Sequence, residues 1–215
     1  MKGIRAVIFD LDGTLTNTLQ DIAEAMNTAL RHLGLPERET DEYRYLVGNG
    51  AAVLARRAAG DRPELAEELH RLYQRQYETH SRVHTRPYPG IPELLKTLSE
   101  AGIAICVLSN KPHPDTVSVV SYYFPEISFT RVLGQTDRFP VKPDPAGALW
   151  IAEELGLRPE EIAYLGDTKV DMECARRAGM HPVGVLWGFR DARELTENGA
   201  ELLLSAPGEL PEHLE

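Results

Sequence analysis

A short apolar segment that ends in two aspartates constrains the fold of this chain more than any other feature. The run 7–9 (Val-Ile-Phe) favours a β-strand buried on both faces, and Asp10 and Asp12 follow it directly. Side chains two positions apart on extended backbone point the same way, so we expect both carboxylates to face one pocket. They repel each other unless a cation lies between them, and a hard divalent cation is the usual solution. The alternative is a polar turn built on Asp12 and Gly13.

Strand and helix patterns alternate through the C-terminal part of the chain. Apolar strands alternating with helices are typical of a parallel sheet covered on both faces. We therefore predict an α/β fold, with a Rossmann-like, doubly wound parallel sheet. The expected helices are 91–101, 113–122, 145–156 and 169–179, and the expected strands are 103–108, 129–133, 161–165 and 182–187, with a weaker one at 201–204.

The first two predicted strands are separated by about ninety residues, whereas a crossover needs little more than one helix. Residues 17–86 show helical periodicity and no strand pattern. We predict that they form an inserted all-helical cap domain, and that 1–16 plus 87–215 form the α/β core. Because ligands bind at the carboxyl ends of parallel strands, and the insert leaves the core just after Asp12, it should cover the site as a lid.

Three further polar clusters follow predicted strands or precede predicted helices. Taken singly, each has an ordinary explanation as a strand-end cap, a solvated lysine, or carboxylates that cap a helix N-terminus. Together with the first two aspartates they should meet at one edge of the sheet. The clusters are Ser109-Asn110-Lys111, Lys142 within KPDP, and Asp167 with Asp171 within GDTKVD.

The order and wording of these motifs resemble those of the haloacid dehalogenase-like superfamily of phosphotransferases over nearly the whole chain. DLDGT is similar to its first motif, SN to its second, the lysine of KPDP to its third and GDTKVD to its fourth. Within that superfamily the chain is most similar to phosphoglycolate phosphatases, through DIAEAMNTAL, VGNG, PYPG and AGM…VLWG. Asn17 is a departure, since many relatives carry aspartate there, and it concerns the hinge rather than the chemistry.

The resemblance implies roles for the four aspartates. Asp10 would be the nucleophile that forms an aspartyl-phosphate, and Asp12 the general acid and then the general base. Mg²⁺ would be bound by Asp10, by the main-chain carbonyl of Asp12 and by Asp167, with Asp171 a ligand through water or a support.

The resemblance also implies the groups that hold the substrate. Ser109, Lys142 and backbone amides near Leu11, Asp12 and Asn110 would hold the phosphoryl oxygens, and Lys111 joins them as a candidate binding residue. The expected substrate is a small phosphate monoester, 2-phosphoglycolate above others.

The turn Gly48-Asn49-Gly50 in the predicted cap is a candidate for recognising the distal end of the substrate. It precedes a helix predicted to start near Ala51, and free amides at a helix N-terminus bind anions. The alternative is an ordinary helix–helix turn in which Gly48 ends the preceding helix.

Other functions remain open at this point. A phosphomutase or a broad-specificity sugar phosphatase would share every core residue, and a dehalogenase would leave Lys142 and the metal-binding carboxylates unexplained. A phosphonate-cleaving enzyme would need a cap lysine, but no lysine occurs between Lys2 and Lys96. A non-catalytic, receiver-like module that accepts phosphate on Asp10 would not explain Asp12 or the lid.

Charge and cysteine content narrow the partners and the compartment. The formal net charge of −10 argues against nucleic acid or an anionic membrane as a partner. Cys106 falls in a predicted buried strand and Cys174 on a predicted helix, positions typical of small core residues in proteins of reducing compartments. With no signal-peptide pattern and no apolar run of membrane-spanning length, we predict a cytoplasmic protein, as a monomer or homodimer.

Overall fold

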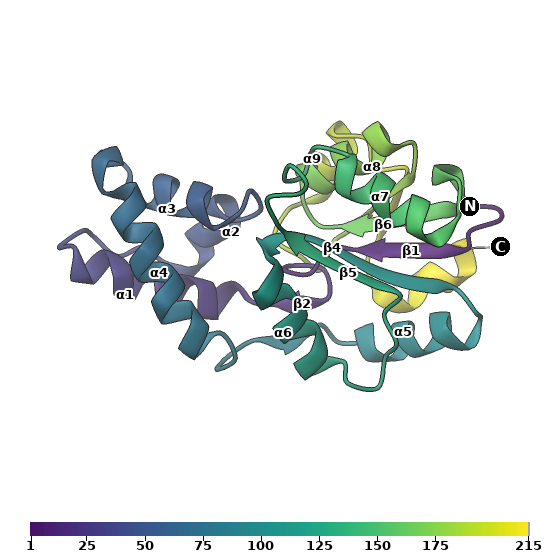
Figure 1. Cartoon of the computed structure of the whole chain (residues 1–215), viewed down its shortest axis with the longest axis horizontal. Coiled ribbons are helices and arrows are strands. Elements are labelled where there is room, and N and C mark those ends of the chain that lie inside the picture. The colour runs from purple at the N-terminus through teal and green to yellow at the C-terminus, as the bar shows by residue number, and fades with distance from the viewer. Residues whose placement is uncertain (215) are drawn as a thin grey trace.

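The computed structural model describes residues 1–214, which form an α/β core and a helical cap side by side along the longest axis (Figure 1). All neighbouring strands of the core sheet are parallel, in the order β5-β4-β1-β6-β7-β8. The predicted fold class is therefore confirmed. The strands are β1 (Ala6–Phe9), β4 (Ala104–Pro112), β5 (Arg131–Gln135), β6 (Ile162–Gly166), β7 (His181–Val185) and β8 (Leu202–Leu204).

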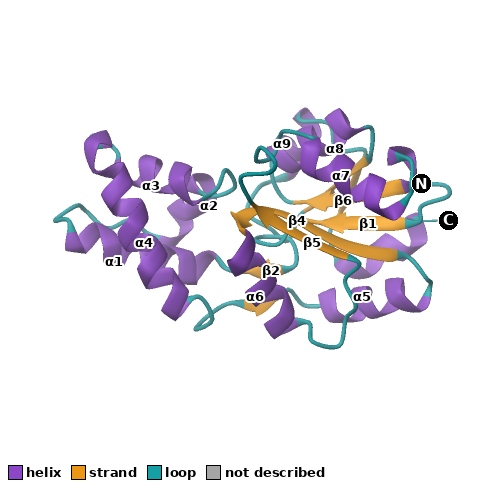
Figure 2. Ribbon diagram, in the orientation of Figure 1, coloured by secondary structure: helices purple, strands orange, loops and turns teal. Residues whose placement is uncertain are grey.

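Helices cover both faces of the sheet, as Figure 2 shows. One face packs on α5 (Ile91–Glu100) and α6 (His113–Tyr123), and the other on α7 (Ala146–Leu155) and α8 (Lys169–Ala178). A further helix, α9 (Ala192–Glu197), and a 3₁₀ segment (Pro207–His213) were not expected from the sequence.

Strand β1 lies at the centre of the sheet, and its side chains alternate between the two apolar layers. Val7 and Phe9 belong to the layer that includes α5, whereas Ala6 and Ile8 belong to the layer that includes α7. Each large apolar side chain buried in this way contributes about 1.5–3 kcal/mol. Phe9 is in register with Val107 of β4 and Leu165 of β6, so the residues just beyond these three positions lie at the same level. The segment Ser109-Asn110-Lys111, predicted to follow a strand that ends at 108, instead belongs to β4, because this strand continues to Pro112 and pairs there with Gln135 of β5.

The cap contains α1 (Leu19–His32), α2 (Tyr43–Leu46), α3 (Ala51–Ala59) and α4 (Ala66–His80). These helices bury an apolar cluster of their own, to which the core adds Phe189. The all-helical insert predicted from the sequence is thus present, and we keep 17–86 as its proposed extent. No helix within residues 1–214 is long and apolar enough to cross a membrane.

A two-stranded ribbon joins the cap to the core, although the sequence predicted no strand within 17–86. Strands β2 (Thr16–Asn17) and β3 (Arg86–Pro87) pair antiparallel, so the two linkers leave and rejoin the core side by side. Strands of two residues are too short to show the alternation by which a strand is recognised. Asn17, the position that departs from the relatives, lies in this ribbon and is exposed.

Candidate active site

Asp10, Asp12 and the segment Ser109-Asn110-Lys111 lie beneath the cap, around one cavity. The other polar core residues predicted for the site, Lys142, Asp167 and Asp171, are buried close to Asp10 and do not line this cavity. The cap closes this cavity with side chains that are mainly apolar and aromatic. The core contributes Asp10, Asp12, Ser109, Asn110, Lys111, Asp115, Thr168 and Phe189, and the cap contributes Ile22, Val47, Gly48, Gly50, Ala51, Leu54, Tyr73, Gln74 and Tyr77.

The loop after β1 holds Asp10 at the centre of the site. The Leu11 amide donates a hydrogen bond to Asp10 Oδ1 at 2.7 Å, and Asp10 itself is buried. The chain then turns at Gly13, where φ is +89° and a Cβ atom would collide with the carboxylate of Asp167. Gly13 therefore allows the β1 loop and the β6 loop to approach each other closely.

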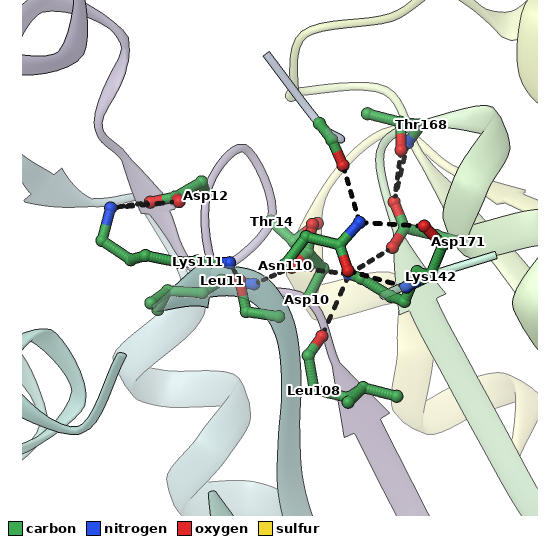
Figure 3. Close-up of polar contacts among 12 residues, drawn as sticks. Asp10, Leu11, Asp12, Thr14, Leu108, Asn110, Lys111, Lys142, Thr168 and Asp171 are labelled. Carbon is green, nitrogen blue, oxygen red and sulfur yellow. Dashed lines mark hydrogen bonds and ion pairs between the residues drawn. The ribbon is translucent and has the colours of Figure 1, made fainter. Parts of the chain in front are cut away.

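Lys142 is buried among acceptors that converge on its ammonium group (Figure 3). Its Nζ lies 2.8 Å from Asp10 Oδ1 and 2.7 Å from Asp171 Oδ1, and it donates to the carbonyl of Leu108 at 3.0 Å. Burial opposes the charged form of Lys142, but the two carboxylates outweigh it and raise the lysine pKa. Lys142 is therefore a fixed positive charge beside Asp10, and Asp10 itself lines the cavity.

Three buried carboxylates lie close together, and two of them, Asp10 and Asp171, pair with that single ammonium group. Asp10, Asp167 and Asp171 each offer an oxygen, and these oxygens all lie within 4.8 Å of one another. Burial raises the pKa of Asp10 to about 7, and burial together with the charges of Asp171 and Asp10 raises the pKa of Asp167. Such crowding of hard oxygen ligands, with one lysine to offset it, fits a divalent cation such as Mg²⁺.

Neighbouring donors fix the orientation of the two aspartates that follow β6. Asp167 accepts hydrogen bonds from Thr14 Oγ1 at 3.2 Å and from the Phe189 amide at 2.8 Å. Asp171 accepts from the amide and the hydroxyl of Thr168 in a capping box at the start of α8. The helix-capping explanation considered for Asp171 thus holds together with its contact to Lys142.

Asp12 lies apart from these three carboxylates and pairs with a different lysine. Lys111 Nζ is 3.2 Å from both carboxylate oxygens of Asp12, and it also donates to the Tyr77 hydroxyl at 2.7 Å. Tyr77 comes from α4 of the cap and stacks on Tyr73. Sequence reasoning missed Tyr77, because an aromatic residue on the apolar face of a helix indicates core packing and nothing more.

The second motif and the cap turn meet directly. The side-chain amide of Asn110 donates to the carbonyls of Gly48 and Lys142, each at 3.0 Å, and its oxygen accepts from the Lys142 amide at 2.7 Å. Ser109 is buried and lines the cavity. Gly50 lines it too, whereas Asn49 accepts a hydrogen bond from Arg57 and lines a second cavity.

Parallel sheet, helical cap and aspartate-rich strand ends together define a hydrolase of the haloacid dehalogenase type, and comparison with known proteins agrees. The haloacid dehalogenase-like hydrolase family matches residues 7–185, and this chain belongs to that family. It is a phosphoric monoester hydrolase similar to proteins named phosphoglycolate phosphatase.

Two relatives and one solved structure illustrate the similarity. The phosphoglycolate phosphatase of Chromobacterium violaceum is 32% identical over 98% of this chain and 96% of its own length. That of Aquifex aeolicus is 32% identical over 96% and 95%. The crystal structure of a predicted phosphoglycolate phosphatase from Haemophilus somnus superposes with a TM-score of 0.90 at 27% identity, covering 98% of each chain.

Proposed function

We propose that this protein is a Mg²⁺-dependent phosphatase that hydrolyses 2-phosphoglycolate through an aspartyl-phosphate on Asp10. The observation that carries the proposal is the position of Asp10. Asp10 is buried at the carboxyl end of the central strand, where it lines the cavity under the cap. Its Oδ1 lies 2.8 Å from Lys142 Nζ. A carboxylate placed there can attack phosphorus once its own charge and that of the phosphate are offset.

The contacts of Asp10 indicate which of its oxygens attacks. Both the Leu11 amide and the Lys142 ammonium contact Oδ1, so Oδ2 is the oxygen available to the substrate. A bond forms between Oδ2 and phosphorus while the bond from phosphorus to the leaving oxygen breaks. Asp12 donates a proton to that oxygen, then takes a proton from the water that cleaves the Oδ2–phosphorus bond and releases inorganic phosphate.

Other residues hold the phosphoryl group and the cation. Lys142, which contacts Asp10, and Ser109, which lines the cavity, would contact phosphoryl oxygens, where charge develops in the transition state. Asp10, Asp167 and Asp171 are the residues that would hold Mg²⁺. When bound, the cation would offset negative charge between the nucleophile and the phosphate.

The distal end of the cavity offers two features that suit a small anionic leaving group. Lys111 reaches the cavity from the core, and the N-terminus of α3 at Gly50 and Ala51 reaches it from the cap. A carboxylate two atoms from the phosphate ester would fit between them. This supports 2-phosphoglycolate, the substrate that the names of the relatives suggest.

The decisive experiment replaces the nucleophile. We expect Asp10→Asn to lower kcat at least a thousandfold, a loss of about 4 kcal/mol of transition-state stabilisation, while the circular dichroism spectrum stays unchanged. Wild-type enzyme quenched in acid during turnover of ³²P-labelled substrate should carry label on Asp10. If Asp10→Asn retains a tenth of the wild-type kcat, the covalent mechanism is wrong.

A further inference from the structure

A second cavity lies on the seam between cap and core, behind the turn that contacts the active site. It is lined by residues of α2, α3 and the intervening turn on the cap side, and by the start of α8 and the region before α9 on the core side, elements that Figure 1 shows facing each other across the seam. Its lining residues are Tyr45, Val47, Gly48, Asn49, Arg57, Thr168, Lys169, Val170, Arg190 and Glu194.

The charge of this seam cavity is opposite to that of the protein. The side chains that line it include three cations, Arg57, Lys169 and Arg190, and one anion, Glu194. The whole chain carries a formal net charge of −10, so a local excess of two positive charges is concentrated here against the general field. Arg57 belongs to the cap and the other two cations to the core, so like charges face each other across the seam.

The existing contacts of these arginines leave part of their hydrogen-bonding capacity unused. Arg190 is 9% exposed in its side chain, donates to the Val47 carbonyl and pairs with Glu194, but its Nη1 is buried and has no hydrogen-bond partner within residues 1–214. A buried guanidinium nitrogen without a partner is costly. Arg57 donates to the Leu46 carbonyl and to the side-chain oxygen of Asn49, and because both acceptors are neutral, these contacts do not cancel its positive charge.

We propose that the seam cavity binds a tetrahedral oxyanion, such as phosphate or sulfate, which joins the cap to the core from a place outside the catalytic pocket. Arg57 would contact the anion from the cap, and Lys169 and Arg190 from the core. Guanidinium groups suit this ligand because their paired N–H donors match two oxygens of a tetrahedral anion. The bound anion offsets the repulsion across the seam and so stabilises the contact between cap and core.

Sulfate titration by calorimetry at constant ionic strength tests this proposal, with neighbouring arginines as a matched pair. Arg56 is exposed on the same helix and does not line the cavity, so Arg56→Gln changes net charge equally. We expect Arg57→Gln to bind one equivalent fewer than both wild type and Arg56→Gln. The test compares the number of sulfate ions bound by each variant with the number bound by wild type. Sulfate binding in the catalytic pocket would add equally to both numbers, so the result does not depend on it or on the proposed catalytic function.

Two more variants keep the test decisive if Arg57→Gln fails to fold. Lys169→Gln should weaken sulfate binding at the seam severalfold, whereas Glu194→Gln, which removes the anion of the cavity, should tighten it severalfold. In wild type, sulfate should also slow amide hydrogen exchange in the segment 46–50, and this protection should be lost in Arg57→Gln. Equal stoichiometry in all variants, non-saturating binding, or weaker binding in Glu194→Gln would overturn the proposal.

A parallel titration with phenylphosphonate separates two sources of the ligand. A free ion and the phosphate group of a larger molecule share the same chemistry, but only the second requires room beyond the cavity. Loss of one phenylphosphonate equivalent in Arg57→Gln would assign the site to phosphate groups of larger molecules. Loss of a sulfate equivalent alone would assign it to the free ion.

Discussion

At the scale of single residues, the site is defined by an imbalance of charge around Lys142. Three buried carboxylates, Asp10, Asp167 and Asp171, lie close together, and within residues 1–214 Lys142 carries the only ammonium group that contacts any of them, pairing with Asp10 and Asp171. The pKa values of Asp10 and Asp167 are raised. A raised carboxyl pKa means that the folded state holds its proton more tightly than the unfolded state does. The same imbalance that suits a cation should therefore make the cation-free protein sensitive to pH.

We predict that the cation-free protein loses stability as the pH rises from 4 to 7. The pKa of Asp10 is 3.8 when unfolded and about 7 when folded. The stability that Asp10 contributes is fully present when the pH is below the pKa of the unfolded state. It is lost as the pH rises through the pKa of the folded state, by at most about 1.4 kcal/mol per pH unit. Urea unfolding at each pH in chelator measures the slope. Mg²⁺ should flatten it, and an identical slope in Asp10→Asn would show that Asp10 is not its source.

The role of Asp12 leads to a prediction about leaving groups. Since a general acid matters most when the departing oxygen is strongly basic, Asp12→Ala should slow hydrolysis of an alkyl phosphate at least tenfold more than that of para-nitrophenyl phosphate. Asp115→Asn is the control, because Asp115 also lines the cavity but has no part in the proposed chemistry. Equal losses on both substrates would mean that Asp12 does not transfer the proton.

At the scale of elements, the turn between α2 and α3 decides how the cap meets the core. Gly48 accepts the hydrogen bond of Asn110, and Gly50 precedes α3 with φ at +86°. A Cβ atom at Gly50 would lie 3.3 Å from Gln135 Oε1 and 3.4 Å from the Asn110 carbonyl. A side chain there is therefore strained in the backbone and presses on the second motif.

We expect Gly50→Val to lower kcat/KM for 2-phosphoglycolate at least tenfold, a loss of about 1.4 kcal/mol. para-Nitrophenyl phosphate, which has no carboxylate to bind at the α3 N-terminus, should be affected much less. Gly60→Val is the matched control, since Gly60 also has a positive φ but ends the same helix at the far side from the cavity. An equal loss of kcat/KM on both substrates would mean that the turn has a purely structural role.

At the scale of the whole molecule, the cap and the core are held together by the paired linkers. The ribbon of β2 and β3 is only two residues long on each side, and Asp21 of α1 reinforces it. The buried carboxylate of Asp21 accepts hydrogen bonds from the amides of His84 and Thr85 and from the Thr85 hydroxyl. Asp21 thus ties the first cap helix to the returning linker through buried hydrogen bonds, whereas Glu24 contacts the same linker only through an exposed pair with the His84 side chain.

Asp21→Ala should lower the free energy of unfolding by about 2–4 kcal/mol, because it leaves buried donors without an acceptor. Glu24→Ala removes an exposed carboxylate one helical turn away, and it should change the free energy of unfolding by less than about 0.5 kcal/mol. Guanidinium-induced unfolding of both variants provides the comparison. If the two variants lose the same stability, the linker is not held by Asp21.

The sequence by itself determined the fold class and the family. Long elements carry a periodic signal, so the strands of the sheet and the helices that cover it were predicted close to their observed bounds. The all-helical insert followed from the length between the first two strands. The positions of Asp10 and Asp167 followed from one rule, that residues after parallel strands emerge at one edge. Ser109 lies within the longer β4, and Lys142 lies in the segment between β5 and α7.

Only the tertiary structure decided what the cap brings to that edge. Strands β2 and β3 have two residues each, which is too short for a periodic pattern to appear in the sequence. The aromatic residues of α4 give the same sequence pattern whether they pack on the other cap helices or contact Lys111 of the core. Likewise, the neighbouring residues Asn49 and Gly50 line different cavities, because the path of the backbone through this turn depends on how the turn packs against the core. Local sequence patterns determine helices and strands, whereas contacts between residues distant in the sequence depend on how those helices and strands pack.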